Sequence, residues 1–448
     1  MQKLPFFFLA SIFALALTIT SFAQLKVAPL NIKERMLPNG LRVVSLMDNN
    51  SPTVAIHVWY DVGGKNDPIG KSGFAHMFEH MMFKSTKNMP NEKLDRLTED
   101  VGGFNNASTW PDYTNYYEVV PSNHLEPLLW AEADRMVNLS VDDANFNSER
   151  KVVQEEFRQS VLAQPYGRFY EFTNSLSYKV HPYKRGVIGN LEELDAATPA
   201  DAAQFYKDFY RPDNAVLIVV GDFNQKQFEA WTDKYFGSIA RPASPIKRVT
   251  ESEPDRTKEE RYHEAGPIVP FPAVSITYLA PDSKSPDIAA LRIAATVLSG
   301  GESSRLYQSL VYKQQIAQEA SFEADIRRDR GLLIFSSIAS EGKTGDLLEK
   351  ALLAELKAIQ SAPVSPSELE KAKNQQVTAA IRQVENNDGK AIVIERAIAY
   401  QGDPKVVNLE IRRLQAVTAA DVQRVMKKYF TDNNRVVIHY TQAEGEKK

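Results

Sequence analysis

Two kinds of hydrophobic pattern alternate along the chain. Segments around Val54 and Val274 alternate apolar and polar positions, which predicts β-strands near the start of each half. Apolar residues at helical spacing predict amphipathic helices over 123–136, 348–359 and 367–384. Since strands and long helices mix in this way, we expect an α+β fold, in which a mostly antiparallel sheet carries helices on one face.

The pattern also repeats itself at an offset of 220 residues. Residues 198–220 and 418–440 each read as a Thr-capped helix, a polar turn and a β-branched strand. Two homologous α/β sandwich domains are therefore predicted, over 24–240 and 262–448. An exposed linker, rich in proline and charge, is expected between them at 241–261. The identical pairs are Thr198/Thr418, Asp201/Asp421, Lys207/Lys427, Asn214/Asn434, Val216/Val436 and Ile218/Ile438.

Residues 1–23 have the features of a secretory signal peptide. Lys3 precedes an apolar run, and Ser21 and Ala23 place small residues before a cleavage point at Gln24. The alternative is an uncleaved membrane anchor, although the run is slightly short for a span. No later segment approaches the length of a membrane span, so none is expected after cleavage. The chain has no cysteine, and export without disulfides favours a periplasmic location.

Composition narrows the classes of function. Lys and Arg number 53 against 57 Asp and Glu, a formal net charge of −4, which argues against a nucleic-acid partner. The lack of cysteine excludes iron–sulfur clusters, zinc fingers built on cysteine and a thiol nucleophile.

Chemistry concentrates in the first half, where His76, Glu79 and His80 form an H-x-x-E-H motif on a predicted helix. Histidines at i and i+4 leave the same helix face and can reach one metal ion. Glu79 lies beside them, within reach of an attacking water. The alternative is a pair of core histidines with satisfied hydrogen bonds. The chain has only seven histidines in 448 residues, so an H-x-x-E-H motif is rarely expected by chance.

A catalytic zinc site needs a third protein ligand and one open position. The segment 148–158 predicts a helix on which Glu149 and Glu156 share a face, while Glu155 turns away. A glutamate-rich helix is more often simply solvated. The chemistry of these residues alone therefore does not select Glu156.

Together these features resemble the pitrilysin/insulinase family of zinc metallopeptidases in its short, bacterial periplasmic form. The resemblance covers 41–440 and implies one Zn²⁺ per chain, held by His76, His80 and Glu156 at the family's spacing. It implies that Glu79 is the catalytic base and that Glu149 supports the site. It also implies that Asn106 and Ala107 lie on an edge strand that binds an extended peptide substrate.

The chain departs from that family in its second half. The family's Arg and Tyr, which anchor substrate and stabilise the oxyanion, fall at Val311 and Gln318. Short members of the family form clamshells of two chains that enclose a chamber. We therefore expect a heterodimer in which a homologous partner subunit supplies the Arg/Tyr pair, or otherwise a homodimer. Tyr307 or Tyr312 as a local substitute has the wrong spacing.

These residues support a zinc-dependent endopeptidase that acts on unfolded peptides. A second reading is a catalytically inactive structural or assembly subunit of the same family. Such members tend to lose ligands or the base, whereas all five acidic and histidine positions are present here. A third reading, a zinc buffer, would not need Glu79 or the edge strand.

Overall fold

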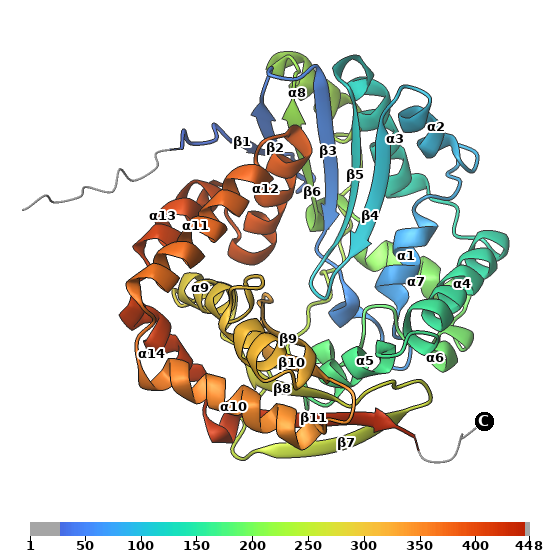
Figure 1. The fold of residues 1–448 in the computed structure, drawn as a ribbon. Coiled ribbons are helices and arrows are strands. Elements are labelled where there is room, and N and C mark those ends of the chain that lie inside the picture. Colours follow the sequence, from blue (N-terminus) through green and yellow to red (C-terminus); the bar gives the residue numbers. More distant parts are fainter. Residues whose placement is uncertain (1–26, 444–448) are drawn as a thin grey trace, which may run out of the picture.

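The computed structural model describes residues 27–443 of the chain (Figure 1). The predicted signal peptide and the charged C-terminal end lie outside the described residues. Between residues 27 and 443, no helix combines the length and the apolarity needed to cross a bilayer.

The first half, up to residue 240, contains a sheet of six strands in the order β1-β2-β6-β3-β5-β4. Neighbouring strands are antiparallel except β2 and β6, which run parallel. Strand β4 lies at one edge and pairs only with β5 among the described residues. The strands are β1 (Lys33–Met36), β2 (Arg42–Met47), β3 (Thr53–Tyr60), β4 (Phe104–Thr109), β5 (Thr114–Pro121) and β6 (Ala215–Gly221).

The second half contains a sheet of five strands in the order β7-β11-β8-β10-β9. Only β7 and β11 are parallel, as only β2 and β6 are in the first sheet. Apart from the additional strand β1, the two sheets therefore share one topology, with β4 and β9 at equivalent edges. The strands are β7 (Glu260–Gly266), β8 (Ala273–Leu279), β9 (Ala317–Asp325), β10 (Leu332–Ala339) and β11 (Arg435–Gln442).

The repeat in the sequence is visible in the helices as well. Helix α7 (Pro199–Phe209) and helix α14 (Ala419–Tyr429) each begin with a capping box, formed by Thr198 with Asp201 and by Thr418 with Asp421. Each helix leads into an equivalent strand, β6 or β11. The prediction of two similar α+β domains is confirmed.

Most helices cover one face of the sheet in their own half, which agrees with the predicted layers (Figure 1). The three helices expected from hydrophobic spacing correspond to α3, α10 and α11. The first half has α1 (Phe74–Met81), α2 (Lys93–Glu99), α3 (Leu125–Asn138), α4 (Asp143–Phe157), α6 (Leu191–Asp195) and α8 (Gln225–Tyr235). The second has α9 (Ile288–Ser299), α10 (Gly345–Ser361), α11 (Pro366–Gln383) and α13 (Glu410–Ala416).

Two helices cross to the other half, which the sequence did not predict. Helix α12 (Asn387–Gln401) packs Ile394 and Ile398 onto the outer face of the first sheet, against Ala55 and Trp59. Reciprocally, α5 (Gly167–Ser175) packs Phe169 onto the second sheet. Each sheet is therefore covered on its second face by a helix of the other half, and the halves are fastened together.

Most of the predicted linker is exposed, but two of its side chains are buried. Residues 241–259 contain no helix or strand. However, Glu253 is buried and accepts hydrogen bonds from three successive backbone N–H groups of the first half. Arg256 is buried too and donates to the carbonyls of Ser177 and Asn434, one in each half. The segment is packed against both halves.

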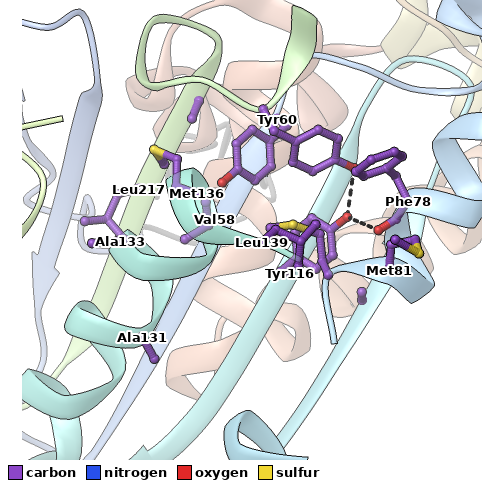
Figure 2. Close-up of a cluster of buried hydrophobic side chains, with 14 of the residues drawn as sticks. Val58, Tyr60, Phe78, Met81, Tyr116, Ala131, Ala133, Met136, Leu139 and Leu217 are labelled. Carbon is purple, nitrogen blue, oxygen red and sulfur yellow. Dashed lines mark hydrogen bonds between the residues drawn. The ribbon is translucent and has the colours of Figure 1, made fainter. Parts of the chain in front are cut away.

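The core of the first half fixes helix α1 to the sheet (Figure 2). The Tyr210 ring packs against Phe78 of α1 and against Tyr60 and Tyr116, which come from neighbouring strands. The Tyr116 hydroxyl donates to the carbonyl of Phe78 at 3.3 Å and lies 2.9 Å from the Tyr210 hydroxyl. The hydroxyls of Tyr116 and Tyr210 are therefore paired, whereas the buried hydroxyl of Tyr60 has no partner among the described residues. Helix α1 thus has a rigid base.

Candidate metal centre

Helix α1, which carries the histidine motif, is fixed at its first residue. Gly73 precedes it with φ 92°, and a Cβ there would lie 2.6 Å from the carbonyl oxygen of Ile188. The buried Asp67 carboxylate accepts from the N–H groups of Gly73 (2.6 Å) and Ala75 (2.9 Å), which a helix start leaves free. Burial raises the pKa of Asp67 to about 7, although these hydrogen bonds oppose the rise.

Three donor atoms converge on one point beside α1. The rings of His76 and His80 are 4.9 Å apart and nearly perpendicular. Glu156, in the last turn of α4, places Oε2 3.6 Å from His76 Nε2 and 3.4 Å from His80 Nε2. Ligands of a tetrahedral zinc, with bonds of about 2.0 Å, would be about 3.3 Å apart. Both distances to Glu156 are close to that value, and all three donor atoms lie within 4.8 Å of one another, which is compatible with a shared zinc ion.

The protonation states of the histidines suit a cation. Burial, followed by the neighbouring His80, lowers the pKa of His76 to about 4, so its imidazole is neutral at pH 7. Its buried Nδ1 has no hydrogen-bond partner among the described residues. Burial also disfavours charge on His80, but Glu149 and then Glu156 outweigh it and raise the pKa of His80. A metal ion would replace the proton that these carboxylates attract.

Glu79 lies beside the three donor atoms without joining them. It is half-buried, and burial raises its pKa, with a smaller opposing effect from Thr109. The Thr109 hydroxyl, at the end of β4, donates to Glu79 Oε2 at 2.6 Å. A carboxylate with a raised pKa that is held next to a metal site can accept and return a proton near neutral pH.

Glu149 lies behind His80 and does not contact the other two donor atoms. It is 5% exposed, with Oε2 3.7 Å from His80 Nδ1 and Oε1 2.6 Å from Lys84 Nζ. Burial raises its pKa, but His80 and Lys84 outweigh burial and lower it. Glu149 is therefore ionised and able to orient the His80 ring, as carboxylates behind zinc-bound histidines do.

The two predicted substrate-binding residues lie on the edge strand β4, beside α1 (Figure 1). Ala107 is buried under α1, whereas Asn106 is exposed. The Asn106 side chain accepts from the N–H of Ala107 at 2.8 Å. Strand β4 ends at Thr109, whose hydroxyl contacts the Glu79 carboxylate, so the edge of this strand lies close to the candidate metal centre.

Comparisons with known proteins identify the family. The profile described as Insulinase (Peptidase family M16) matches residues 42–190, and that described as Peptidase M16 inactive domain matches residues 196–376. The zinc protease PqqE of Helicobacter pylori is 30% identical over 406 residues, 90% of this chain and 91% of that protein. The chain belongs to the M16 peptidase family. The resemblance found in the sequence is confirmed.

Further matches also extend over both halves of the chain. The crystal structure of a protease from Helicobacter pylori is 29% identical and covers 92% of this chain and 99% of its own, with a TM-score of 0.87. A probable mitochondrial-processing peptidase subunit beta of Arabidopsis thaliana is 24% identical, covering 89% of this chain and 76% of its own length. The two-domain fold is thus the M16 fold.

Among the described residues, the second half has no second set of two histidines and a glutamate. Val311 is half-buried in the π-helix Tyr307–Lys313, and Gln318 is exposed on β9. A second His-and-acid group joins Asp346, Glu349 and His439. Its Glu349 already binds His439 Nε2 at 2.8 Å and an arginine of β7, so the group is satisfied as an ion-pair network.

Sequence reasoning gave no role to Thr109, Asp67 or Lys84. Thr109 lies within the edge-strand motif, so its position beside the site could have been suspected from that motif. Asp67 carries no such signal, because nothing in the spacing before a helix marks a residue six positions ahead of its cap.

Proposed function

We propose that this chain is a zinc-dependent endopeptidase that hydrolyses unfolded peptides or small polypeptides. The observation that carries the proposal is the set of three donor atoms of His76, His80 and Glu156, with the Glu79 carboxylate beside them. Two imidazoles and one carboxylate are a donor set of catalytic zinc sites with an open position. The chemistry that a zinc ion held there supplies is Lewis-acid polarisation of a carbonyl and acidification of water.

Glu79 is assigned the proton transfers. Its raised pKa brings it toward neutrality, so it can take the proton of the attacking water and return it to the leaving amine. Thr109 fixes one carboxylate oxygen and leaves the other free for this exchange. Glu149 is assigned the orientation of His80 rather than a proton transfer.

The peptide substrate is assigned to the free edge of β4, next to Asn106 and Ala107. An extended peptide that adds to this edge would pair through its main chain, which gives affinity without a strict sequence requirement. Its scissile bond would lie toward the Thr109 end of the strand, where Glu79 is held.

A homologous partner subunit is part of the proposal. Val311 and Gln318 occupy the positions of the family's Arg/Tyr pair; valine has no side-chain donor, and glutamine is neither a cation like Arg nor a phenol donor like Tyr. We assign that pair to a second chain across an enclosed chamber, in a heterodimer, with a homodimer as the alternative assembly. We assign the complex to the periplasm, because residues 1–23 have the features of a secretory signal peptide and the chain has no cysteine.

The test is cleavage of a quenched, unstructured peptide by the mature zinc-loaded chain, beside its Glu79→Gln variant. The variant should bind zinc equally and lose about 10² to 10⁴ in kcat, the usual contribution of a general base. Undiminished cleavage by the variant would refute the base assignment. If the wild type binds zinc without turnover, homologous chains that carry the Arg/Tyr pair should restore it; failure with all of them would favour the inactive subunit.

A further inference from the structure

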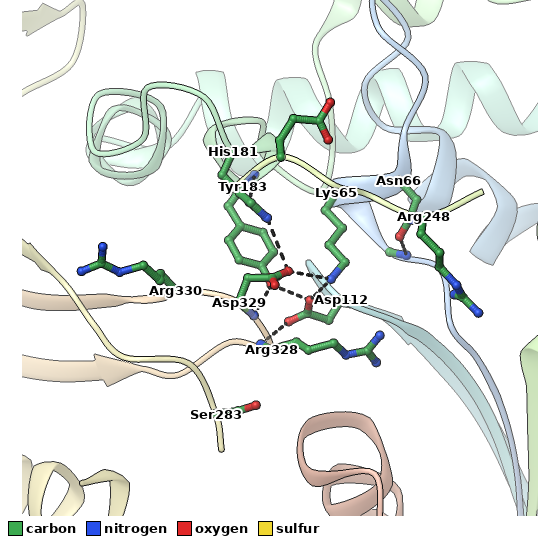
Figure 3. A network of polar contacts seen from close by, with 12 residues as sticks. Lys65, Asn66, Asp112, His181, Tyr183, Arg248, Ser283, Arg328, Asp329 and Arg330 are labelled. Carbon is green, nitrogen blue, oxygen red and sulfur yellow. Dashed lines mark hydrogen bonds and ion pairs between the residues drawn. The ribbon is translucent and has the colours of Figure 1, made fainter. Parts of the chain in front are cut away.

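A charged turn of the second half is packed against the first half (Figure 3). It joins β9 to β10, comprises residues 326–331, and is called the charged hairpin below. Arg328 pairs with Asp61, and its backbone N–H donates to the Asp112 carboxylate at 2.9 Å. Both partners belong to the first half. The hairpin therefore makes its polar contacts at the boundary between the halves.

Asp329 of this hairpin completes a polar cluster (Figure 3). Its Oδ2 lies 3.1 Å from Lys65 Nζ and 3.4 Å from His181 Nε2. Lys65 also binds Asp112 at 2.7 Å, and the Tyr183 hydroxyl donates to Asp112 at 2.5 Å. Lys65 is 8% exposed and Asp112 is fully buried, so each charge depends on these partners.

The cluster fixes the end of the edge strand β4. Asp112 lies three residues beyond Thr109, the last residue of β4. The carbonyls of the two residues after Thr109 accept from the N–H groups of Gly64 and Lys65, each at 3.1 Å. Lys65 therefore holds this segment twice, through its backbone and through its ammonium group.

Thr109 in turn contacts the catalytic base. Its hydroxyl is the one side-chain donor within residues 27–443 that makes a hydrogen bond to the Glu79 carboxylate, at 2.6 Å. A shift of the strand end would move this donor and with it the carboxylate. In enzymes, misplacement of a reacting group by about 1 Å can cost about 10²-fold in rate.

We propose that the charged hairpin is a positioning element for the catalytic base, in which Asp329 acts through Lys65 and Asp112 to hold Thr109 against Glu79. The inference rests on the proposed peptidase function for its kinetic consequence. None of the residues assigned to catalysis belongs to the second half. Through the charged hairpin, the second half would nevertheless influence the catalytic base of the first half.

The first test is the Asp329→Asn variant, which keeps the size of the side chain and removes its charge. We expect kcat to fall by about 10-fold to 10²-fold, with KM and bound zinc unchanged. The measurement uses the form of the protein, single chain or complex, that cleaves the peptide. The matched control is Asp48→Asn, which breaks another ion pair between the halves, with Lys390, at the opposite end of β3. The control should leave kcat unchanged; equal losses in both variants would overturn the proposal.

A double-mutant cycle tests the path through Thr109. Thr109→Val removes the donor to Glu79 with little change in shape. If Asp329 acts through Thr109, the combined variant should have the kcat of Thr109→Val alone. Losses that multiply would show that Asp329 acts by another path and would overturn the proposal.

Amide hydrogen exchange separates this inference from the peptidase assignment. In Asp329→Asn, amides of residues 104–113 should exchange faster than in the wild type, and in Asp48→Asn they should not. This readout needs no turnover, so a chain that never cleaves refutes the peptidase proposal while the hairpin is still tested. Unchanged exchange in Asp329→Asn would overturn the link between hairpin and strand.

Discussion

The two halves share a sheet topology, apart from the additional strand β1, but one pair of equivalent helices differs in its chemistry. Helix α9 occupies in the second half the place of α1 in the first, because it packs against β9 and α14 as α1 packs against β4 and α7. Helix α1 carries two histidines and a glutamate, whereas α9 contains neither histidine nor an acidic residue. Equivalent sheets and the equivalent capped helices α7 and α14 therefore surround a polar helix, α1, in one half and an apolar helix, α9, in the other. Fold alone does not assign the chemistry.

The first half buries polar groups at and beside α1, whereas the buried side chains of α9 are almost all apolar. Asp67 is buried and needs two backbone N–H donors at the start of α1, and the buried Nδ1 of His76 lacks a partner among the described residues. By contrast, α9 buries seven residues, all of them apolar except Thr296. Buried polar groups with few partners cost stability and persist where function needs them. In the first half, the unpartnered Nδ1 belongs to one of the three donor residues of the candidate metal centre.

The largest effect is expected from removal of a metal ligand, because it would abolish the zinc site that distinguishes the first half from the second. Glu156→Gln should lose tight zinc binding and with it at least about 10² in turnover, because two ligands hold zinc poorly. The matched control is Glu155→Gln on the same helix turn, where the side chain is exposed and pairs with Arg158 at 3.3 Å. Zinc content and the rise of Tm on zinc addition measure both variants. Loss of zinc in Glu155→Gln instead would contradict the assignment.

A smaller effect is expected at the contact that fastens the halves together. His57 of β3 lies 2.9 Å from Glu395 and 3.2 Å from Asp388, both on α12 of the second half, and stacks on Tyr117. Burial opposes its charge, but the two carboxylates outweigh burial and raise the pKa of His57 to about 9. The stabilisation is therefore complete below pH 6.5 and is lost as pH rises through about 9, by up to about 3 kcal/mol.

Urea unfolding at pH 6 and pH 10 measures this effect. The free energy of unfolding of His57→Gln should fall below that of the wild type at pH 6, and the gap should narrow at pH 10. A gap of equal size at both pH values would show that the imidazole is uncharged in the folded protein.

The sequence predicted the elements within each half better than the contacts between them. The H-x-x-E-H spacing was sufficient to place His76 and His80 on one helix face, because that geometry is local. Glu156 needed the family's spacing, because any glutamate on that helix face satisfied the local rules. The exchange of α5 and α12 and the position of Asp329 depend on how the halves pack. No periodicity within 20 residues carries that information, nor does it show that Glu253 and Arg256 of the linker are buried.

The smallest predicted effect compares the shared elements directly. Thr198 and Thr418 cap α7 and α14, and their hydroxyls accept from the N–H groups of Asp201 (3.3 Å) and Asp421 (3.1 Å). Thr→Ala at either position should lower the free energy of unfolding by about 1 kcal/mol, since one helix donor loses its acceptor. Thr→Ser at each position keeps the hydroxyl and serves as the control. The two losses should agree within about 0.5 kcal/mol, because the geometry is the same. A loss at one position alone would show that the equivalence of the halves ends at their topology and does not extend to the energetics of their shared elements.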